Sequence, residues 1–332
     1  MNFVLDAEQL PSLNHYLKDR KWIGPDETVE TASKPGEGNM NYTLRIRTNF
    51  RSFIIKQSRD YVEKYPQIPA PRERAIIEGR FYELIQRIPQ LKHVTPEINN
   101  IDEENSIIML EDLGESNDFT FLYQAEQQID SQDLDDISAF ISLLHQSFSS
   151  GQVSIDLSNR AMRALNAEHI FQYPFMEDNG FDLDQVIPGL QEIAMPYKTD
   201  SALKETIATL SKYYTEDGPT LLHGDYYPGS WLKTLEGVRI IDPEFCFFGR
   251  AEFDLSVCVA HFMMGEQDKT VVTRLLSHYE GPEDFDEGLM WQLTGVEIMR
   301  RLIGLAQLPL TLSLEKRVIL LQQARGFIMQ QN

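Results

Sequence analysis

The sequence predicts an α+β chain with a small β-rich N-terminal lobe that contains one helix, and a large, mostly α-helical C-terminal lobe. Apolar and polar residues alternate over residues 43–47, and apolar residues fill residues 53–55, which indicates two strands. A helical spacing of apolar residues first appears over residues 72–88 and dominates most of the remaining chain. We therefore expect one lobe at residues 1–113, which ends with a hinge, and a second at residues 114–332.

The individual elements follow from these two periodicities and from turn chemistry. Asn49 lies in the short segment that should turn between the first two strands. In chain order we expect strands at residues 43–47 and 52–56, a proline-rich loop at residues 66–71, a helix at residues 72–88, a strand at residues 106–110, and helices at residues 137–145, 203–214, 291–306 and 314–330.

The charge of the chain excludes two classes of partner. With 30 basic and 51 acidic residues, the net charge is −21. A surface this acidic repels nucleic-acid phosphates and anionic membranes, so we expect neither as a partner. The longest apolar stretch, residues 255–264, contains His261 and is too short to span a bilayer. We expect a cytoplasmic protein, with a homodimer as a candidate assembly.

The two cysteines do not suggest a metal site or a disulfide framework. Cys246 and Cys258 form no CxxC pair and lack the spacing of zinc ligands. We expect two free thiols in the protein core.

The strongest chemical signal is a pair of apolar runs that each end in an aspartate, Asp225 and Asp242. A hairpin with Gly237 at its turn would place both carboxylates at one edge. Phosphoryl transfer needs such a pair, because one carboxylate takes the proton of the acceptor hydroxyl and the other holds magnesium on the phosphates. Ser230, five residues after Asp225, is a candidate second metal ligand or orienting group. The alternative is that the aspartates only cap turns, which the complete motif disfavours.

The pattern HGDxxxGS followed by IDPEF, G and FD resembles methylthioribose kinase, within the aminoglycoside phosphotransferase and choline kinase superfamily. Four further segments resemble the glycine loop, the lysine strand, the hinge and the twin-arginine helix of that family; they are residues 38–42, 54–57, 109–113 and 297–306. The resemblance covers roughly residues 30–328. It implies a protein-kinase-like two-lobe fold and an ATP-dependent small-molecule kinase with Mg²⁺.

The resemblance also implies roles for individual residues. Asp225 is the catalytic base and touches the acceptor, Asp254 braces the catalytic loop, and Lys56 clamps the ATP phosphates. The implied nucleotide-binding residues are Gly38, Asn41, Lys56, Glu78, Glu111, Asp112 and Leu113, and the implied metal ligands are Asp242, Glu244 and Ser230. Tyr227, Arg300 and Arg301 are the other implied acceptor-binding residues.

Arg300 and Arg301 are neighbours on a predicted helix, so their side chains point about 100° apart. We therefore expect one of them to reach the active site and the other to bind a structural carboxylate.

The acceptor implied by the resemblance is the 1-hydroxyl of 5-methylthioribose, or a related sugar, in methionine salvage. The family typically has Leu-His after the catalytic aspartate, whereas this chain has Tyr226 and Tyr227. An aminoglycoside, a fructosamine or an amino alcohol is the alternative acceptor, and a nucleotide-binding pseudokinase is a further alternative. Only 11 residues separate Asp242 from Asp254. This leaves no room for a long regulatory loop and favours a metabolite acceptor over a protein.

Overall fold

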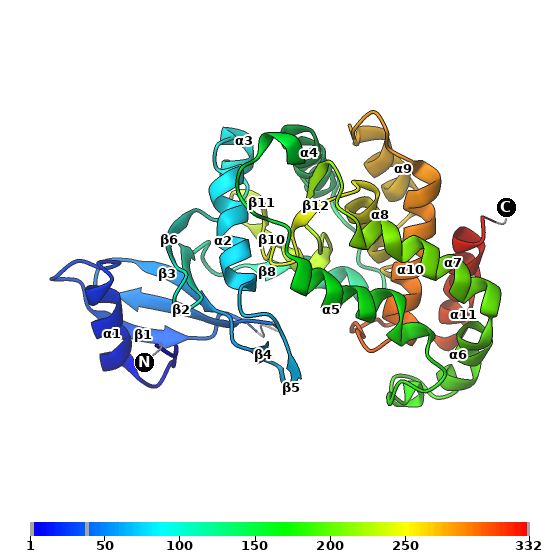
Figure 1. The fold of residues 1–332 in the computed structure, drawn as a ribbon, viewed down its shortest axis with the longest axis horizontal. Coiled ribbons are helices and arrows are strands. Elements are labelled where there is room, and N and C mark those ends of the chain that lie inside the picture. Colours follow the sequence, from blue (N-terminus) through cyan, green and yellow to red (C-terminus); the bar gives the residue numbers. More distant parts are fainter. Residues whose placement is uncertain (1–2, 37–39, 331–332) are drawn as a thin grey trace. The chain divides into compact units, whose positions relative to one another are not determined.

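The computed structural model describes residues 3–36 and 40–330, and its chain forms two compact units (Figure 1). The first unit consists of Met1–Ser116 and Arg239–Phe245, and the second of Asn117–Val238 and Cys246–Asn332. The chain therefore leaves the first unit after Ser116 and returns to it for one short segment. Hydrogen bonds hold that segment in the first unit, where the Ile240 amide donates to the Val94 carbonyl over 2.8 Å.

The first unit contains one antiparallel sheet of five strands in the order β1-β2-β3-β7-β6. Its strands are β1 (Val29–Ser33), β2 (Tyr42–Thr48), β3 (Ser52–Gln57), β4 (Tyr61–Val62), β5 (Tyr65–Pro69), β6 (Ile98–Asp102) and β7 (Ile107–Glu111). Its helices in the described residues are α1 (Leu10–Asp19), α2 (Arg74–Ile85) and α3 (Pro89–His93). The predicted strands and the predicted helix at residues 72–88 are confirmed, while α1, α3, β4 and β6 were not expected. The predicted proline-rich loop is corrected in part, because its first residues belong to β5, which pairs with β4.

One face of this sheet is buried against α1. Leu44 and Ile46 of β2, and Phe53 and Ile55 of β3, are buried in one core cluster with residues of α1. Successive strand residues point to opposite faces. Lys56 therefore lies on the other face.

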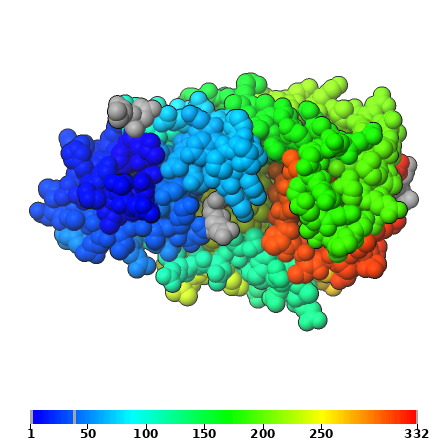
Figure 2. All heavy atoms as spheres, turned by 90° about the horizontal axis from the view of Figure 1, so that it is seen from below, coloured from blue at the N-terminus to red at the C-terminus, as the bar shows by residue number. Residues whose placement is uncertain are grey.

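The second unit is mostly helical, as predicted. Its α-helices are α4 (Ser131–Ser147), α5 (Arg160–Phe171), α6 (Leu190–Thr199), α7 (Ser201–Thr215), α8 (Glu252–Met264), α9 (Lys269–His278), α10 (Glu287–Ile303) and α11 (Leu314–Ile328). Short 3-10 helices are η1 (Phe119–Tyr123), η2 (Ser150–Gln152), η3 (Tyr173–Phe175), η4 (Leu183–Gln185) and η5 (Pro228–Ser230). Helix α10 packs between α8 and α11. In Figure 2, the green segment that contains α5 and α6 lies beside the orange-red C-terminal helices on the surface.

The strands of the second unit correct one prediction. They are β8 (Asn117–Asp118), β9 (Thr220–Leu222), β10 (Trp231–Thr234) and β12 (Phe247–Gly249), and β11 (Gly237–Ile240) begins in this unit and ends in the first. The hairpin at Gly237 joins β10 to β11. Strand β9, which precedes Asp225, pairs instead with β12, with Leu222 opposite Phe247. The expected hairpin between the two aspartate-ending strands is therefore wrong, because the segment between them supplies its own strand.

Helix α8 holds the longest apolar stretch of the sequence, and twelve of its thirteen residues are buried. Cys258 of α8 and Cys246 are both buried thiols outside any disulfide, as predicted. Among the described residues, no helix combines the length and apolar character needed to cross a membrane.

Candidate active site

In the first unit, Lys56 lies between two carboxylates. It is near the end of β3, and its Nζ is 2.7 Å from Oε1 of Glu78 on α2. It also forms an ion pair with Asp242, which follows β11. Lys56 and Glu78 are buried, whereas the Asp242 side chain is 43% exposed. The structure therefore brings together three residues that the sequence analysis assigned to the nucleotide and the metal.

The opposite charges of Lys56 and its two carboxylate partners stabilise one another. Burial alone would lower the pKa of Lys56, but the carboxylates of Asp242 and Glu78 outweigh it and raise the pKa. Burial raises the pKa of Glu78, and the ammonium group of Lys56 opposes that shift. Lys56 therefore remains a cation that is held between two carboxylates.

Glu244 lies beside this group and is also buried. The Asn41 Nδ2 donates to Glu244 Oε2 over 3.0 Å, and the Arg74 Nε lies 3.6 Å from the same oxygen. Burial, together with the nearby Glu78, raises the pKa of Glu244 to about 8. A buried carboxyl group with a raised pKa gains most when a cation arrives.

The residues present fit a magnesium ion. Among the described residues, no group of three or more histidine, cysteine or acidic side chains could hold a metal. Magnesium does not need such a group, because it commonly binds one or two carboxylates and takes its other ligands from phosphates and water. Asp242 and Glu244 provide two carboxylates, one half-exposed and one buried. The Oδ1 of Asn41 is buried and has no hydrogen-bond partner in the described part of the chain.

The hinge, defined here as Glu111–Leu113 together with Gly114, begins at the last residue of β7. The Glu111 amide donates to the Glu97 carbonyl over 2.8 Å, whereas the backbone of Leu113 makes no hydrogen bond in the described part of the chain. The glycine-loop residue Gly38 lies outside the described residues.

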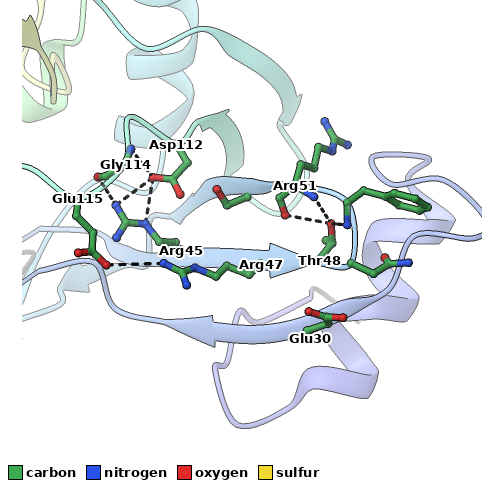
Figure 3. A pocket seen from close by; sticks show the side chains of 11 residues that line it. Glu30, Arg45, Arg47, Thr48, Arg51, Asp112, Gly114 and Glu115 are labelled. Atoms are coloured by element: carbon green, nitrogen blue, oxygen red, sulfur yellow. Dashed lines mark hydrogen bonds and ion pairs between the residues drawn. The ribbon is translucent and has the colours of Figure 1, made fainter. Parts of the chain in front are cut away.

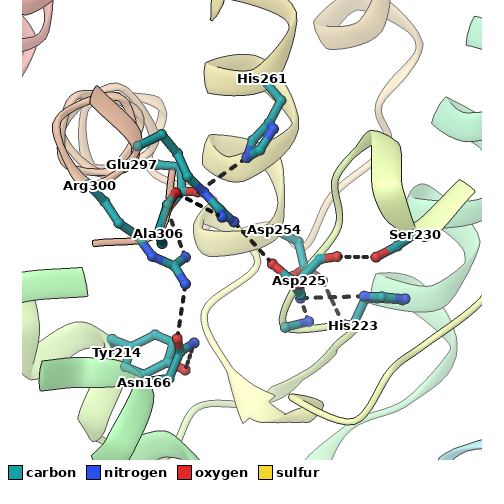
Figure 4. Close-up of polar contacts among 12 residues, drawn as sticks. Asn166, Tyr214, His223, Asp225, Ser230, Asp254, His261, Glu297, Arg300 and Ala306 are labelled. Carbon is teal, nitrogen blue, oxygen red and sulfur yellow. Dashed lines mark hydrogen bonds and ion pairs between the residues drawn. The ribbon is translucent and has the colours of Figure 1, made fainter. Parts of the chain in front are cut away.

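In the second unit, Asp225 lies on a loop that is held by Asp254 of α8. The amides of His223 and Gly224 donate to the two carboxylate oxygens of Asp254 over 2.7 and 2.9 Å. Gly224 has a φ of +84°, which favours glycine. The Ser230 hydroxyl donates to the Asp225 carbonyl over 2.8 Å (Figure 4). The expected contact of Asp254 with the loop is therefore present.

The twin arginines of α10 share a carboxylate. Glu297 lies three and four residues before them, which places it on their side of the helix. Its Oε2 is 3.1 Å from Nη1 of Arg300, and its Oε1 is 2.6 Å from Nε of Arg301. Of the two arginines, Arg301 also approaches Asp225, with 3.6 Å between Nη2 and Oδ1. Arg300 instead donates to Asn166 Oδ1 over 3.2 Å.

A buried network that the sequence analysis missed supports the arginines. His261 Nε2 lies 3.2 Å from Glu297 Oε1, and the Tyr123 hydroxyl lies 2.5 Å from His261 Nδ1. Burial lowers the pKa of His261 to about 4, so its ring is neutral near pH 7. Burial would raise the pKa of Glu297, but Arg300 and Arg301 hold it well below its usual range. The sequence signal that could have revealed this network is His261, a histidine inside the apolar run of α8.

The two tyrosines after Asp225 have different environments. Tyr226 is fully buried, and its hydroxyl donates to the Ile137 carbonyl over 2.8 Å. The ring of Tyr227 lies 5.4 Å from the guanidinium of Arg301 and 5.0 Å from the His261 ring. Only Tyr227 is therefore placed to contact a molecule beside Arg301.

Comparison with known proteins agrees with these motifs. Residues 149–291 match the phosphotransferase enzyme family known as APH. Methylthioribose kinase of Bacillus velezensis is 26% identical over 249 residues, which cover 70% of this chain and 61% of that protein, less than two thirds of its length. Methylthioribose kinase of Bacillus cereus is 24% identical over 337 residues, which cover 88% of this chain and 83% of that protein. The resemblance read from the motifs is thus confirmed as distant homology.

Solved structures show the fold. The structure of LicA in complex with AMP matches with a TM-score of 0.55 at 13% identity, over 98% of this chain and 99% of that one. The choline kinase LicA from Streptococcus pneumoniae matches with a TM-score of 0.51 at 13% identity, over 96% of this chain and 99% of that one. The predicted α+β, kinase-like fold is confirmed.

Proposed function

We propose that the protein transfers the γ-phosphoryl group of ATP to a sugar hydroxyl, because residues 149–291 match the phosphotransferase enzyme family. The favoured acceptor is the 1-hydroxyl of 5-methylthioribose or of a related sugar, because the relatives named above are methylthioribose kinases. One observation carries the proposal: the Asp225 loop is bound by Asp254, with Arg301 beside the Asp225 carboxylate.

Asp225 is the proposed catalytic base. Its carboxylate orients the acceptor hydroxyl and takes its proton as the oxygen attacks phosphorus. The hydrogen bonds between Asp254 and the loop backbone fix the loop that carries Asp225 before the acceptor binds. No conformational entropy then has to be lost to order this loop during the reaction. Arg301 offers a planar, multidentate donor to a sugar oxygen or to the transferring phosphoryl group.

Lys56, Asp242 and Glu244 are the proposed phosphate and metal groups. Lys56 binds phosphate oxygens as a fixed cation, and Glu78 holds its ammonium group. Asp242 and Glu244 would hold magnesium, which neutralises charge on the phosphates when it is bound. Asn41 and the hinge Glu111–Leu113 are the proposed contacts to the nucleotide, and Ser230 remains a proposed metal ligand or orienting group.

The charges near Asp225 favour a neutral or anionic acceptor. Arg300 and Arg301 are two buried cations, and their partner Glu297 is already bonded to both. Asp254 is likewise bonded to the loop. A cationic aminoglycoside or amino alcohol that approaches Asp225 would meet the guanidinium group of Arg301, which lies 3.6 Å from the Asp225 carboxylate. The net charge of −21 is the observation that favours the cationic alternative.

A screen of ADP release against sugars, amino alcohols and aminoglycosides, with 5-methylthioribose included, tests the proposal. We expect turnover with 5-methylthioribose or a related sugar, and little dependence of its KM on ionic strength. Turnover only with cationic acceptors, together with a KM that rises steeply with salt, would establish the alternative acceptor class. Nucleotide binding without transfer to any acceptor would favour a pseudokinase.

Replacing Asp225 tests its role in the reaction. We expect Asp225→Ala to lower kcat by at least about a hundredfold, because the general base is lost, while ATP still binds. Steady-state kinetics and equilibrium binding of ATP measure the two effects. A folded Asp225→Ala variant that keeps its turnover, or that loses ATP binding, would contradict the assigned role.

A further inference from the structure

Arg45 of β2 is joined to the hinge by three polar contacts. Its Nε and Nη2 each lie 3.0 Å from Oδ1 of Asp112, and its Nη2 donates to the Gly114 carbonyl over 2.5 Å (Figure 3). The Gly114 amide donates to the same Asp112 oxygen over 3.0 Å. The Arg45 and Asp112 side chains are only 14% and 5% exposed. A nearly buried, charged group thus fixes both the side chain and the backbone of the hinge.

The position of Arg45 on the sheet relates it to the proposed nucleotide contacts. In the pairing of β2 with β3, Thr43 is opposite Lys56 and Arg45 is opposite Ile54. Alternate strand residues share a face, so Arg45 and Lys56 point to the same side of the sheet. Lys56 is the proposed phosphate clamp, and Arg45 binds the proposed base-binding segment on that same side.

The hinge has a shape that needs this support. Gly114 has a φ of +79°, and the backbone of Leu113 makes no hydrogen bond in the described part of the chain. Free backbone groups can pair with the edge of a purine only if their positions are held. A segment that is fixed before the ligand arrives loses less conformational entropy on binding.

Arg45 also lines a pocket whose other arginines are paired with carboxylates. The pocket has a volume of about 390 Å³ and is also lined by Arg47, Arg51 and Glu115. Each arginine is already paired, since Arg51 binds Glu27 over 3.0 Å and Arg47 lies 3.8 Å from Glu115. The pocket is therefore not prepared for an anion, and what is distinctive there is the attachment of Arg45 to the hinge.

We propose that Arg45 is a positioning residue for the nucleotide, which acts by holding Asp112 and Gly114 so that the hinge backbone meets the base. This inference rests on the proposed function, because it assumes that ATP binds to the hinge. It assigns to Arg45 an effect on nucleotide affinity and no effect on the acceptor or on the chemical step.

The test compares Arg45→Ala with Arg47→Ala. Arg47 lies two residues further along β2, its side chain is 59% exposed, and it forms an ion pair with the exposed Glu115, so it is a matched control. We expect Arg45→Ala to raise the Kd of ATP about tenfold, because charged hydrogen bonds are lost, with kcat and the acceptor KM unchanged. Arg47→Ala should leave all three constants unchanged. Arg45→Lys should restore only part of the affinity, since one ammonium group cannot reproduce the forked contact.

The possible outcomes separate this inference from the proposed function. Wild-type protein that binds no ATP in equilibrium titration would overturn both. Wild-type protein that binds ATP, with a folded Arg45→Ala variant of equal affinity, would overturn the role of Arg45 alone. Equal losses of ATP affinity in Arg45→Ala and Arg47→Ala would show a general effect of charge. Full wild-type affinity in Arg45→Lys would show that the forked guanidinium contact is not needed. Either result would overturn the inference.

Discussion

Arg300 and Arg301 are adjacent in the sequence and differ in what they touch. Both bind Glu297, but Arg301 is 3.6 Å from Asp225 whereas Arg300 reaches Asn166. From the sequence we expected one arginine at the site and the other on a structural carboxylate. Instead, a single carboxylate orients both, which follows from the spacing of three and four residues on a helix.

The two arginines should therefore have unequal effects on turnover. We expect Arg301→Ala to lower kcat/KM by about a hundredfold, as for the loss of one donor to the transition state, and Arg300→Ala to lower it by about tenfold through misplacement of Glu297. Steady-state kinetics with the acceptor found in the screen measure both effects. Arg300→Ala serves as the matched control, and an equal or reversed order of the two losses would contradict the assignment.

At the scale of elements, α10 carries the arginines and is held against α11 at close range. Gly295 of α10 faces the backbone of α11, and a Cβ atom there would lie 2.4 Å from the Ala324 carbonyl oxygen. The helix can sit this close only because residue 295 has no side chain. The position of the arginines thus depends on a glycine more than one helical turn away.

Gly295→Ala should force α10 and α11 apart. We expect a loss of about 1–3 kcal/mol in the free energy of unfolding, the usual effect of overpacking, measured by denaturant titration. Gly288→Ala is the control, because Gly288 is exposed on the same helix and a Cβ atom there would lie 3.1 Å from its nearest neighbour, Asp286 Oδ1. Unchanged stability of Gly295→Ala would show that the two helices can adjust without cost.

For the whole molecule, the buried network around His261 links folding to pH. The pKa of this ring is about 4 in the folded chain because it is buried, against about 6.5 in an unfolded chain. Between these values the unfolded state binds a proton that the folded state does not bind. The contribution is fully present above pH 6.5 and is lost as pH falls toward 4.

We therefore expect the free energy of unfolding to fall by about 3 kcal/mol from this residue as pH falls through that window, because each unit of pKa shift corresponds to about 1.4 kcal/mol. Denaturant titrations at several pH values measure it. His261→Gln should reduce the change of the free energy of unfolding with pH above pH 4.5. Glu297 contributes little in that range, because Arg300 and Arg301 hold the pKa of Glu297 well below its usual range in the folded chain. His15→Gln is the control, since the His15 side chain is 79% exposed. An unchanged slope in His261→Gln would contradict the burial effect.

Much of the fold could be predicted because its signals are local. Strand β2 alternates clearly, β3 contains a short apolar run, and α2, α7, α10 and α11 show helical spacing, so each was placed within a few residues. Helix α1 was missed, and so was the pairing of β9 with β12. In both cases the element is stabilised by partners distant in the chain, such as Phe247 opposite Leu222.

The sequence by itself determined the chemistry of the site: an acidic chain, a motif with Asp225 and Asp242, a strand lysine at Lys56 and a pair of arginines. Periodicity and spacing are properties of short segments, so they can be read without coordinates. The tertiary structure alone decided which arginine lies beside Asp225, that Glu297 and a neutral His261 hold it, and that Arg45 binds the hinge. These contacts join residues from separate elements, and only the packing of those elements brings them within hydrogen-bond distance.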